Sequence, residues 1–370
     1  MILHGQIVEQ RIDGDERGHF VKELVLARGP VPIAMVRKRL AKSRRSRAID
    51  SATEAAAPTR ATLLLIHGFG QNRYAFHLPA RSMVNQLARA GFDVYNVDLR
   101  GRGRSGHFGA ERPSTVLDFV HEDLPTALSE IQEISGARPV FLVGHSLGGA
   151  IAYCMAVDRP GQVAGVVSIG TPYHFTLGAR WLAAFGSAFL AIDRRFGLPN
   201  AAVPTRALGS LMRVTRRFVE SPLYPFPLRG FHRGSIEPEV LDQHLALAMD
   251  IGSISTMRAM FAWASEVRAA NASDASAQGL FGYGERFEAL DVPLLIVAGK
   301  HDDMAPPASV KPGFERSQSS DKTYRELPFG HLDLLVGRDA PLLTWPLIES
   351  WLGKRAERAA KKQLERGAAA

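Results

Sequence analysis

Cysteine is almost absent from this chain, which has a single one, Cys154, among 370 residues. A lone cysteine excludes an intrachain disulfide framework and a multi-cysteine metal or iron–sulfur site. Long apolar runs are also lacking: the longest nearly unbroken one, Trp181 to Ile192, is well short of the ~20 residues that a helix needs to cross a bilayer. The first ten residues have neither the basic start nor the apolar run of a secretory signal. The sequence therefore predicts a cytoplasmic protein without a membrane span.

The composition is that of a folded globular chain, with 46% apolar and 22% charged residues. Its length allows two domains, or one large α/β domain with an insertion, at roughly 150 residues per domain. The formal net charge of +8 indicates attraction to anionic surfaces but names no partner.

Much of the positive charge is concentrated in one stretch: Arg37, Lys38, Arg39, Lys42, Arg44, Arg45 and Arg47. One interpretation is a phosphate-binding strip that makes peripheral contact with an anionic membrane. The favoured interpretation is a solvated linker, because no aromatic residues are interleaved for stacking on bases. We expect no nucleic-acid partner, and the basic C-terminal tail from Lys354 is interpreted in the same way.

Short apolar runs alternate with helical patterns from Ala61 onward, after a predicted N-terminal hairpin (Phe20 to Ala27 and Val31 to Arg39) and a surface connection (Ser43 to Arg60). Continuous runs such as LLLI and VFLV are typical of strands buried on both faces, so the alternation predicts an α/β protein with a mostly parallel sheet flanked by helices. The predicted strands are Thr62 to Ile66, Asp93 to Asp98, Val140 to Val143, Val163 to Ile169, Pro293 to Ala298 and Thr323 to Leu327. The predicted helices between them are Ala80 to Ala90, Thr115 to Ile134 and Leu147 to Val157.

The alternation stops between Pro172 and Asp291, where helical segments such as Trp181 to Ile192 and Ile254 to Val267 predict a helical insertion. The expected organisation is a first core part (1–172, with the hairpin), a helical cap (173–290) and a second core part with the basic tail (291–370). The last helix is expected to have Pro346 in its first turn, which leaves Leu342 outside it.

Gly144-His145-Ser146-Leu147-Gly148 fits the pattern G-x-S-x-G, directly after the run VFLV and directly before a helical pattern. A nucleophilic serine needs this sharp strand-to-helix turn, because the turn lifts the hydroxyl above the sheet and the glycines relieve the crowding. Ser146 is therefore the candidate nucleophile.

His67-Gly68-Phe69-Gly70 follows the predicted strand TLLLI. Acyl transfer needs two backbone N–H donors for the developing oxyanion, one from the residue after the nucleophile and one from the loop after an earlier strand. We assign them to Leu147 and Phe69. His67 itself is interpreted as a loop-packing residue, since the base of such an enzyme comes late in the chain.

Asp302 and Asp303 follow the predicted strand PLLIVA, and His331 follows the last short strand. A serine hydroxyl needs a base to remove its proton, and the imidazole needs a carboxylate that fixes its tautomer. The order serine, acid, histidine fits Ser146, Asp302 and His331. Asp303, and more remotely Asp333, compete with Asp302 as the acid.

Two patterns suggest other chemistry. Gly101 to Gly106 satisfies G-x-G-x-x-G, but His107 to Pro113 is loop-like where a dinucleotide site needs a helix. Cys154 is interpreted as a small core residue rather than a nucleophile.

These residues resemble the α/β-hydrolase superfamily, of the esterase and lipase type with a helical cap. The resemblance covers about Thr62 to Ser168 and Pro293 to the last helix, with the motifs LLLIHGFG, DLRGRGRSG, FLVGHSLGG and the G-x-x-D of GKHD. It implies the α/β-hydrolase fold, with Ser146 as nucleophile, Asp302 as acid because it falls fourth in G-x-x-D, and His331 as base.

The region of His331 also resembles that of some acid lipases and polyhydroxyalkanoate synthases. The synthases of this type carry a cysteine nucleophile, and haloalkane dehalogenases and epoxide hydrolases carry an aspartate, whereas position 146 is serine.

The sequence thus predicts a serine hydrolase that cleaves a carboxylic ester through an acyl-enzyme and needs no metal or organic cofactor. Apolar and aromatic residues of the insertion (Trp181, Phe185, Phe189, Phe261 and Trp263) predict an apolar acyl pocket, or form the cap's own core. The alternatives are an acyltransferase with the same triad and a non-catalytic lipid-binding protein of this fold. The sequence makes no prediction of oligomeric state.

Overall fold

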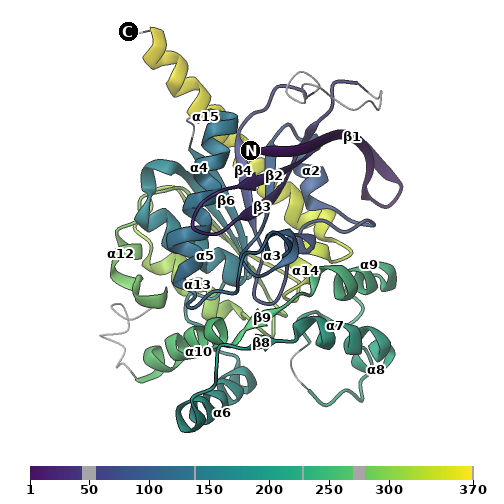
Figure 1. Ribbon diagram of the computed structural model, residues 1–370, viewed down its shortest axis with the longest axis vertical. Coiled ribbons are helices and arrows are strands. Elements are labelled where there is room, and N and C mark those ends of the chain that lie inside the picture. The colour runs from purple at the N-terminus through teal and green to yellow at the C-terminus, as the bar shows by residue number, and fades with distance from the viewer. Residues whose placement is uncertain (44–55, 137–138, 227–228, 270–279, 369–370) are drawn as a thin grey trace.

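The chain is built around one sheet of nine described strands, in the order β1-β2-β3-β5-β4-β6-β7-β10-β11 (Figure 1). The structure is a computed structural model and describes residues 1–43, 56–136, 139–226, 229–269 and 280–368. From β5 to β11 neighbouring strands are parallel, whereas β1, β2, β3 and β5 pair antiparallel. The strands of the sheet are β1 (Ile2–Asp13), β2 (Glu16–Ala27), β3 (Ile33–Leu40), β4 (Thr62–Ile66), β5 (Asp93–Asp98), β6 (Val140–His145), β7 (Val163–Ile169), β10 (Leu294–Gly299) and β11 (Lys322–Leu327).

Helices cover both faces of this sheet. Alternate residues of β4 join different clusters: Leu64 packs with residues of α4 and α5, and Leu63 with residues of α2 and α15. Such two-sided burial explains why the parallel strands are continuous apolar runs. The helices outside the segment between β7 and β10 are η1 (Arg73–Ala75), α2 (Met83–Arg89), α3 (Gly103–His107), η2 (Phe119–Asp123), α4 (Leu124–Ser135), α5 (Leu147–Asp158), η3 (Pro160–Gln162), α13 (Pro307–Arg316), α14 (Asp333–Val336) and α15 (Ala340–Ala368).

The mostly parallel sheet and the predicted hairpin are confirmed, but the sequence interpretation missed β1. This strand pairs with β2 along most of its length, from Ile2 opposite Val25 to Asp13 opposite Glu16. Its sequence, ILHGQIVEQRID, mixes polar and apolar residues because β1 is an edge strand that is largely exposed. An edge strand of this kind lacks the apolar run that identified the buried strands.

The interpretation of the basic stretch as a solvated linker is wrong for its first three residues. Arg37, Lys38 and Arg39 lie in β3, inside the sheet, and are at most 5% exposed. Arg37 donates to both carboxylate oxygens of Asp93, at 2.8 and 2.7 Å, and both arginines pair with Glu23. These charges are therefore used inside the protein and form no phosphate-binding strip. Arg44, Arg45 and Arg47 lie outside the described residues.

Lys38 is buried among neutral groups. Its Nζ donates to Gln10 Oε1 at 2.5 Å and to Asn85 Oδ1 at 2.8 Å, and lies 3.1 Å from His77 Nε2. Burial, with the nearby charges of Lys22 and Arg73, lowers the pKa of Lys38 well below its ordinary value. The contacts join β1, β3 and α2, so this lysine holds the antiparallel edge of the sheet against a helix.

The segment between β7 and β10, here called the insert (residues 170–293), is mainly helical, as predicted. It lies at one end of the molecule, opposite the C-terminus (Figure 1). Its cap boundaries, 173–290, stay a prediction. Its elements are α6 (Arg180–Phe196), β8 (Ala202–Val203), α7 (Thr205–Val214), α8 (Arg216–Val219), α9 (Pro238–Gln243), η4 (His244–Ala248), β9 (Gly252–Ser253), α10 (Ile254–Ala269) and α12 (Gly284–Glu288).

The aromatic residues of the insert pack mainly on each other. Phe261 contacts Phe175, Phe185 and Phe189, with ring centroids 5.5 to 5.9 Å apart. Phe189, Phe261 and Trp263 are buried, whereas Trp181 and Phe185 are exposed. The buried members form an internal core between α6 and α10, which is the second of the two interpretations of this aromatic set.

The expected start of the last helix was wrong. α15 begins at Ala340, so Leu342 lies inside it and Pro346 lies well past the first turn. The backbone N–H groups of Leu342 and Leu343 both donate to Asp339 O. Pro341, not Pro346, is the proline of the first turn, where the missing N–H costs no helix hydrogen bond. Within the described chain, no helix combines the length and the apolar character that crossing a membrane requires.

Candidate active site

Ser146 lies on a sharp turn between β6 and α5, with φ 54° and ψ −123°. A positive φ is rare for a residue with a side chain and indicates a backbone held by its surroundings. The turn depends on close approaches: a Cβ on Gly148 would lie 2.1 Å from Ile66 O, and one on Gly144 would lie 2.4 Å from the backbone of Gly149. Ser146 is half-buried, whereas its neighbours His145 and Leu147 are buried. The turn therefore presents the serine and hides the residues beside it.

Asp302 and His331 form a buried hydrogen-bonded pair. His331 Nδ1 donates to Asp302 Oδ2 at 2.7 Å, and the other carboxylate oxygen accepts from the N–H groups of Met304 and Ala305 at 2.8 and 2.7 Å. With its proton on Nδ1, a neutral His331 leaves Nε2 free to accept another. Burial disfavours the charged imidazole, but the Asp302 carboxylate, together with the nearby charges of Asp303 and Asp333, outweighs it, so the pKa of His331 is raised above its ordinary value.

The structure brings this pair to the turn that carries Ser146. The His145 and His331 ring centroids are 4.6 Å apart, and His145 Nε2 donates to His331 O at 3.2 Å. Gly170, directly after β7, lies between the strand ends, where a Cβ would lie 3.3 Å from both Asp302 Oδ2 and His331 Nδ1. No hydrogen bond between Ser146 Oγ and His331 is found in the described chain. Catalytic hydrogen bonds are often long before substrate binds.

The competing carboxylates bind backbone amides instead of His331. Asp303 accepts from the N–H groups of Arg229 and Gly230 at 2.6 and 3.1 Å. Asp333 accepts from the N–H groups of His232 and Gly330 at 2.8 and 2.7 Å. Burial raises the pKa of both carboxyl groups. The two side chains thus attach residues 229–232 of the insert to the loops that carry Asp302 and His331.

The two amides assigned to the oxyanion lie on elements that pack together. The loop after β4 touches the start of α5, since the carbonyl groups of Ile66 and His67 leave no room for a Cβ on Gly148. The Gly68 N–H donates to Gln71 Oε1 at 3.2 Å. By contrast, the Phe69 and Leu147 N–H groups donate to no described residue. Unpaired amides at this position are what an oxyanion site requires.

His67 packs the loop, as predicted, and is not placed as a base. Its Nδ1 donates to Gly68 O at 3.0 Å and its Nε2 accepts from Leu99 N at 3.2 Å. Burial and the nearby charge of Arg102 lower the pKa of His67 to about 3. Both ring nitrogens of His67 therefore have a hydrogen-bond partner, and the lowered pKa keeps the imidazole neutral.

Sequence reasoning missed two residues that organise this edge of the sheet. His145 joins the Ser146 turn to the backbone of His331, and burial lowers its pKa well below the ordinary value. Asp250, in the insert, accepts from the Gly103 N–H and the Asn72 side chain at 2.9 and 3.0 Å, and pairs with Arg206 at 2.9 Å. No sequence motif indicates the partner of His145 or of Asp250, so each contact is seen only in the folded structure.

The two other patterns have structural roles. Cys154 is fully buried and burial raises its thiol pKa well above the ordinary value. A short helix, α3, ends at His107, and residues 108–113 are loop, as expected. The N–H groups of Gly103 and Arg104 at its start donate to Asp250 and Asp98. Carboxylates thus occupy the place of a nucleotide phosphate. Nowhere in the described ranges do three His, Cys, Asp or Glu side chains gather to hold a metal ion.

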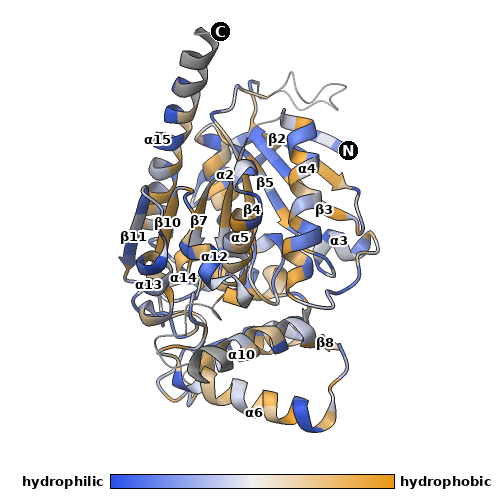
Figure 2. Ribbon diagram, turned by 90° about the vertical axis from the view of Figure 1, so that its left-hand side faces the viewer, coloured by the Kyte–Doolittle hydropathy of each residue, from blue (hydrophilic) through white to orange (hydrophobic). Residues whose placement is uncertain are grey.

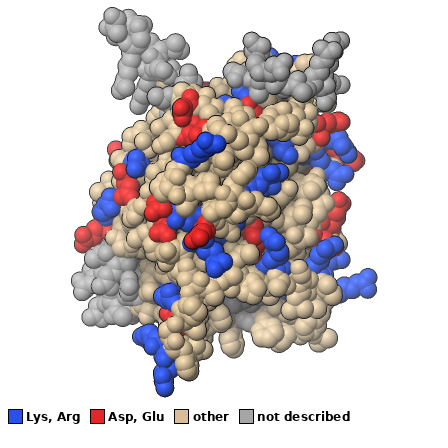
Figure 3. Space-filling model, viewed as in Figure 1, with Lys and Arg blue, Asp and Glu red and all other residues tan. Residues whose placement is uncertain are grey.

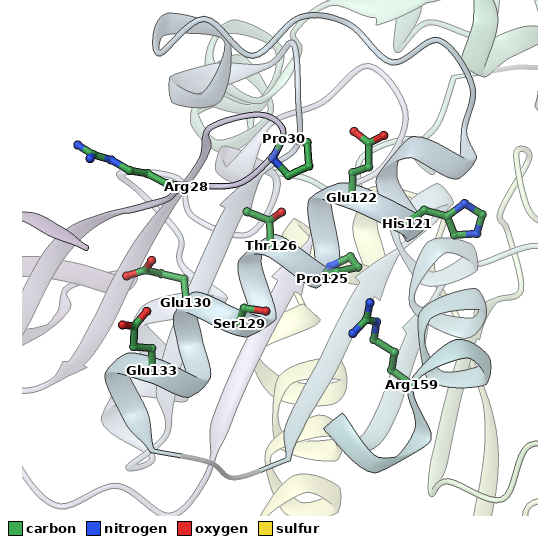
Figure 4. Close-up of a pocket in the computed structure, with 10 residues that line it drawn as sticks. All are labelled: Arg28, Pro30, His121, Glu122, Pro125, Thr126, Ser129, Glu130, Glu133 and Arg159. Atoms are coloured by element: carbon green, nitrogen blue, oxygen red, sulfur yellow. The ribbon is translucent and has the colours of Figure 1, made fainter.

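A surface pocket of about 300 Å³ lies away from this edge, beside η2 and α4 (Figure 4). Its lining mixes both charges: it includes Arg28 and Arg159 as well as Glu122, Glu130 and Glu133. It contains none of the candidate catalytic residues, and its mixed charges favour no single class of ligand.

Comparison with known proteins agrees with this architecture. A family model described as alpha/beta hydrolase fold matches residues 61–338. The poly(3-hydroxyalkanoate) polymerase subunit PhaC of Haloferax mediterranei is 23% identical over 367 residues, which cover 95% of this chain and 69% of that protein. Epoxide hydrolase B of Mycobacterium tuberculosis is 31% identical over 111 residues, which cover 30% of this chain and only 29% of that protein.

Among solved structures, a soluble variant of monoglyceride lipase from Saccharomyces cerevisiae has a TM-score of 0.58 and is 16% identical. The match covers 90% of this chain and 96% of that one. At this level of identity the similarity establishes the shared fold.

Proposed function

The chain belongs to the α/β-hydrolase fold family, and from that premise we propose that it is a serine hydrolase acting on a carboxylic ester. Ser146 is the nucleophile, His331 the general base, Asp302 the orienting acid, and the Phe69 and Leu147 amides bind the oxyanion. The observation that carries the proposal is the buried Asp302–His331 hydrogen bond beside the strained turn of Ser146.

The proposed reaction has two halves. Ser146 Oγ attacks the acyl carbon while His331 Nε2 accepts its proton, and the carbonyl oxygen becomes an oxyanion between the two amides. The tetrahedral intermediate then collapses, the C–O bond to the leaving alcohol breaks, and His331 returns the proton to that alcohol. Water, deprotonated by the same imidazole, releases the acid from the acyl-enzyme.

The residue at position 146 supports an ester rather than the substrates of the two matched relatives. In the resemblance on which the assignment rests, epoxide hydrolases use an aspartate and the polymer synthases a cysteine, whereas this chain has serine. We also propose an apolar acyl group; the buried aromatic residues of the insert form its own core, so the chain-length assay below decides this proposal.

Acyl transfer to an acceptor other than water is the second candidate, favoured by the similarity to PhaC over 95% of this chain. The same acyl-enzyme serves both reactions, and pocket shape and exclusion of water decide between them. Product analysis with and without added alcohols or thiols separates the two.

The primary test is Ser146→Ala, assayed on chromogenic esters of increasing chain length. Turnover should fall on the order of 10⁶-fold, as when the nucleophile of another serine hydrolase is deleted. A fluorophosphonate probe should label the natural protein and not the variant. Near-normal turnover by the variant would remove Ser146 from the chemistry, and a preference confined to acetate esters would contradict the apolar acyl group.

A further inference from the structure

Exposed apolar side chains are concentrated on one part of the insert. Of the seventeen large apolar side chains exposed in the described chain, eleven lie between Leu177 and Phe226. Single exposed apolar residues are normal, but a group of them marks a site of interaction. The exposed side chains of residues 177–226, on α6, α7, α8 and the loop after α8, are here called the docking face.

α6 has more apolar side chains than its contact with the rest of the protein buries. The side that includes Leu182 and Phe189 is buried in the core shared with α10. A neighbouring stripe at helical spacing is exposed: Trp181, Phe185, Ile192 and Phe196, which are 50% to 70% exposed. In Figure 2 this helix lies farthest from the sheet, at the bottom of the view, with several orange turns.

α7 repeats this arrangement. Leu208, Leu211 and Val214 are 50%, 59% and 86% exposed and recur every third residue along one side of the helix. On its buried side are Thr205 and Gly209, where a Cβ on Gly209 would lie 2.7 Å from Leu245 O. The helix is thus held against η4 on this side, and its exposed residues Leu208, Leu211 and Val214 have no described partner surface.

The docking face is also basic. Residues 173–226 contain seven arginines against Asp193 and Glu220, a net charge of +5 within a chain whose net charge is +8. Both acids are paired, with Arg258 and Arg216. The exposed side chains of Arg180, Arg194, Arg213 and Arg217 form no ion pair with any described residue. In Figure 3, the lower part of the molecule has blue side chains and hardly any red.

We propose that the docking face binds the surface of an anionic lipid layer. Amphipathic helices with arginines and large apolar residues bury their apolar side at the headgroup boundary while their cations meet anionic headgroups. A second copy of this chain fits less well, since the exposed arginines of two such faces that form no ion pair with a described residue would repel each other. The docking face, rather than the basic stretch from Arg37, is the proposed membrane contact. This proposal does not depend on the proposed chemistry, because binding to lipid needs no turnover.

Trp181 provides a reporter for the test. It is 66% exposed, whereas Trp263, Trp345 and Trp351 are at most 5% exposed and report little of the surface. Emission spectra are recorded with phosphatidylcholine vesicles and with vesicles that also contain phosphatidylglycerol. We expect a blue shift, and protection from acrylamide quenching, with the anionic vesicles. Trp181→Phe should abolish both changes while vesicle sedimentation still detects binding.

Matched variants locate the surface. Leu208→Gln/Leu211→Gln removes two exposed leucines of α7 and should weaken binding to anionic vesicles by about tenfold or more. Leu342→Gln/Leu343→Gln removes two exposed leucines of α15, outside the insert, and should leave binding unchanged. Arg213→Gln/Arg217→Gln should weaken binding by about tenfold at low ionic strength, and less at high salt. Unchanged urea unfolding confirms that each variant is folded.

Three results would overturn the proposal. One is anionic vesicles that neither sediment the protein nor change Trp181 emission. Another is equal binding by the α7 and α15 variants. The third is acrylamide protection of Trp181 without lipid, lost on dilution, which would identify a second copy of the chain as the partner.

Discussion

The sheet and the insert treat the same residue types in opposite ways. In the central strands of the sheet these residues are buried: β4, β6 and β10 are buried at every position, and Arg37 of β3 is enclosed by Asp93 and Glu23. In the insert, leucines of α7 and arginines of α6 to α8 face solvent. Burial and pairing fix positions in the sheet, which suits a part that holds reacting groups in place. Exposure in the insert suits a part that meets other molecules.

The largest expected effect is a difference in kcat between variants of two adjacent carboxylates. Asp302 binds His331 beside the sheet, whereas Asp303 binds backbone amides of the insert. Asp302→Asn keeps one oxygen, which the Met304 and Ala305 N–H groups hold, so that its NH2 group would face His331 Nδ1 and favour the wrong tautomer. This variant should lower kcat by about 10⁴-fold, as in other serine hydrolases. Asp303→Asn, whose side chain binds only backbone amides of Arg229 and Gly230, should lower kcat by less than about tenfold, since an amide oxygen still accepts a hydrogen bond. Steady-state kinetics on one soluble ester decide; equal losses would mean that the two carboxylates share the role.

A smaller effect distinguishes buried from exposed arginine. Arg37→Ala leaves Asp93 without its cation and Glu23 with Arg39 alone, and should destabilise the fold by about 3–5 kcal/mol. Arg213→Ala, on the exposed side of α7, should change stability by less than about 0.5 kcal/mol. Urea unfolding at pH 7 measures both. If the two variants were equally stable, the buried charge network would contribute nothing to the fold.

The smallest effect is a shift along the pH axis. The base must be neutral to accept the serine proton, and the pKa of His331 is raised above its ordinary 6.5. Activity should therefore fall as pH falls, with a midpoint above 6.5, and Asp302→Asn should move that midpoint down. The same raised pKa stabilises the fold below the ordinary value, and this contribution is lost as pH rises through the folded-state pKa. A midpoint at or below that of an ordinary histidine in the kcat/KM profile would contradict this account.

The sequence was sufficient for the parts of the fold that repeat a simple pattern. Buried parallel strands such as Thr62–Ile66 were predicted with correct bounds, because two-sided burial leaves a continuous apolar run. The turn at Ser146 was predictable because its close approaches require glycine at fixed positions. The triad and oxyanion roles stay predictions until Ser146→Ala and Asp302→Asn are assayed.

The contacts that the sequence did not predict are polar contacts between residues far apart in the chain. Lys38 looks solvated in the sequence, and only the packing of β1 and α2 on β3 surrounds it with Gln10 and Asn85. Asp250 looks like an ordinary surface acid, and Asp303 like a competing catalytic acid, until the insert folds back on the loops at this edge of the sheet. A one-dimensional pattern records periodicity and turn residues, but not which distant partner satisfies a polar group.

The pairing of β7 with β10 keeps the sheet continuous on either side of the insert. These strands are separated by more than a hundred residues, yet Leu294 lies opposite Val166 in the sheet. Ser146 comes before the insert in the chain, and Asp302 and His331 come after it. The continuous pairing of parallel strands β6, β7 and β10 therefore holds the three proposed residues at one edge of the sheet. Closing a longer loop adds only about 0.6 kcal/mol per doubling of length. The length of the insert can therefore change at little entropic cost, as long as residues 229–232 still bind Asp303 and Asp333 beside the proposed triad.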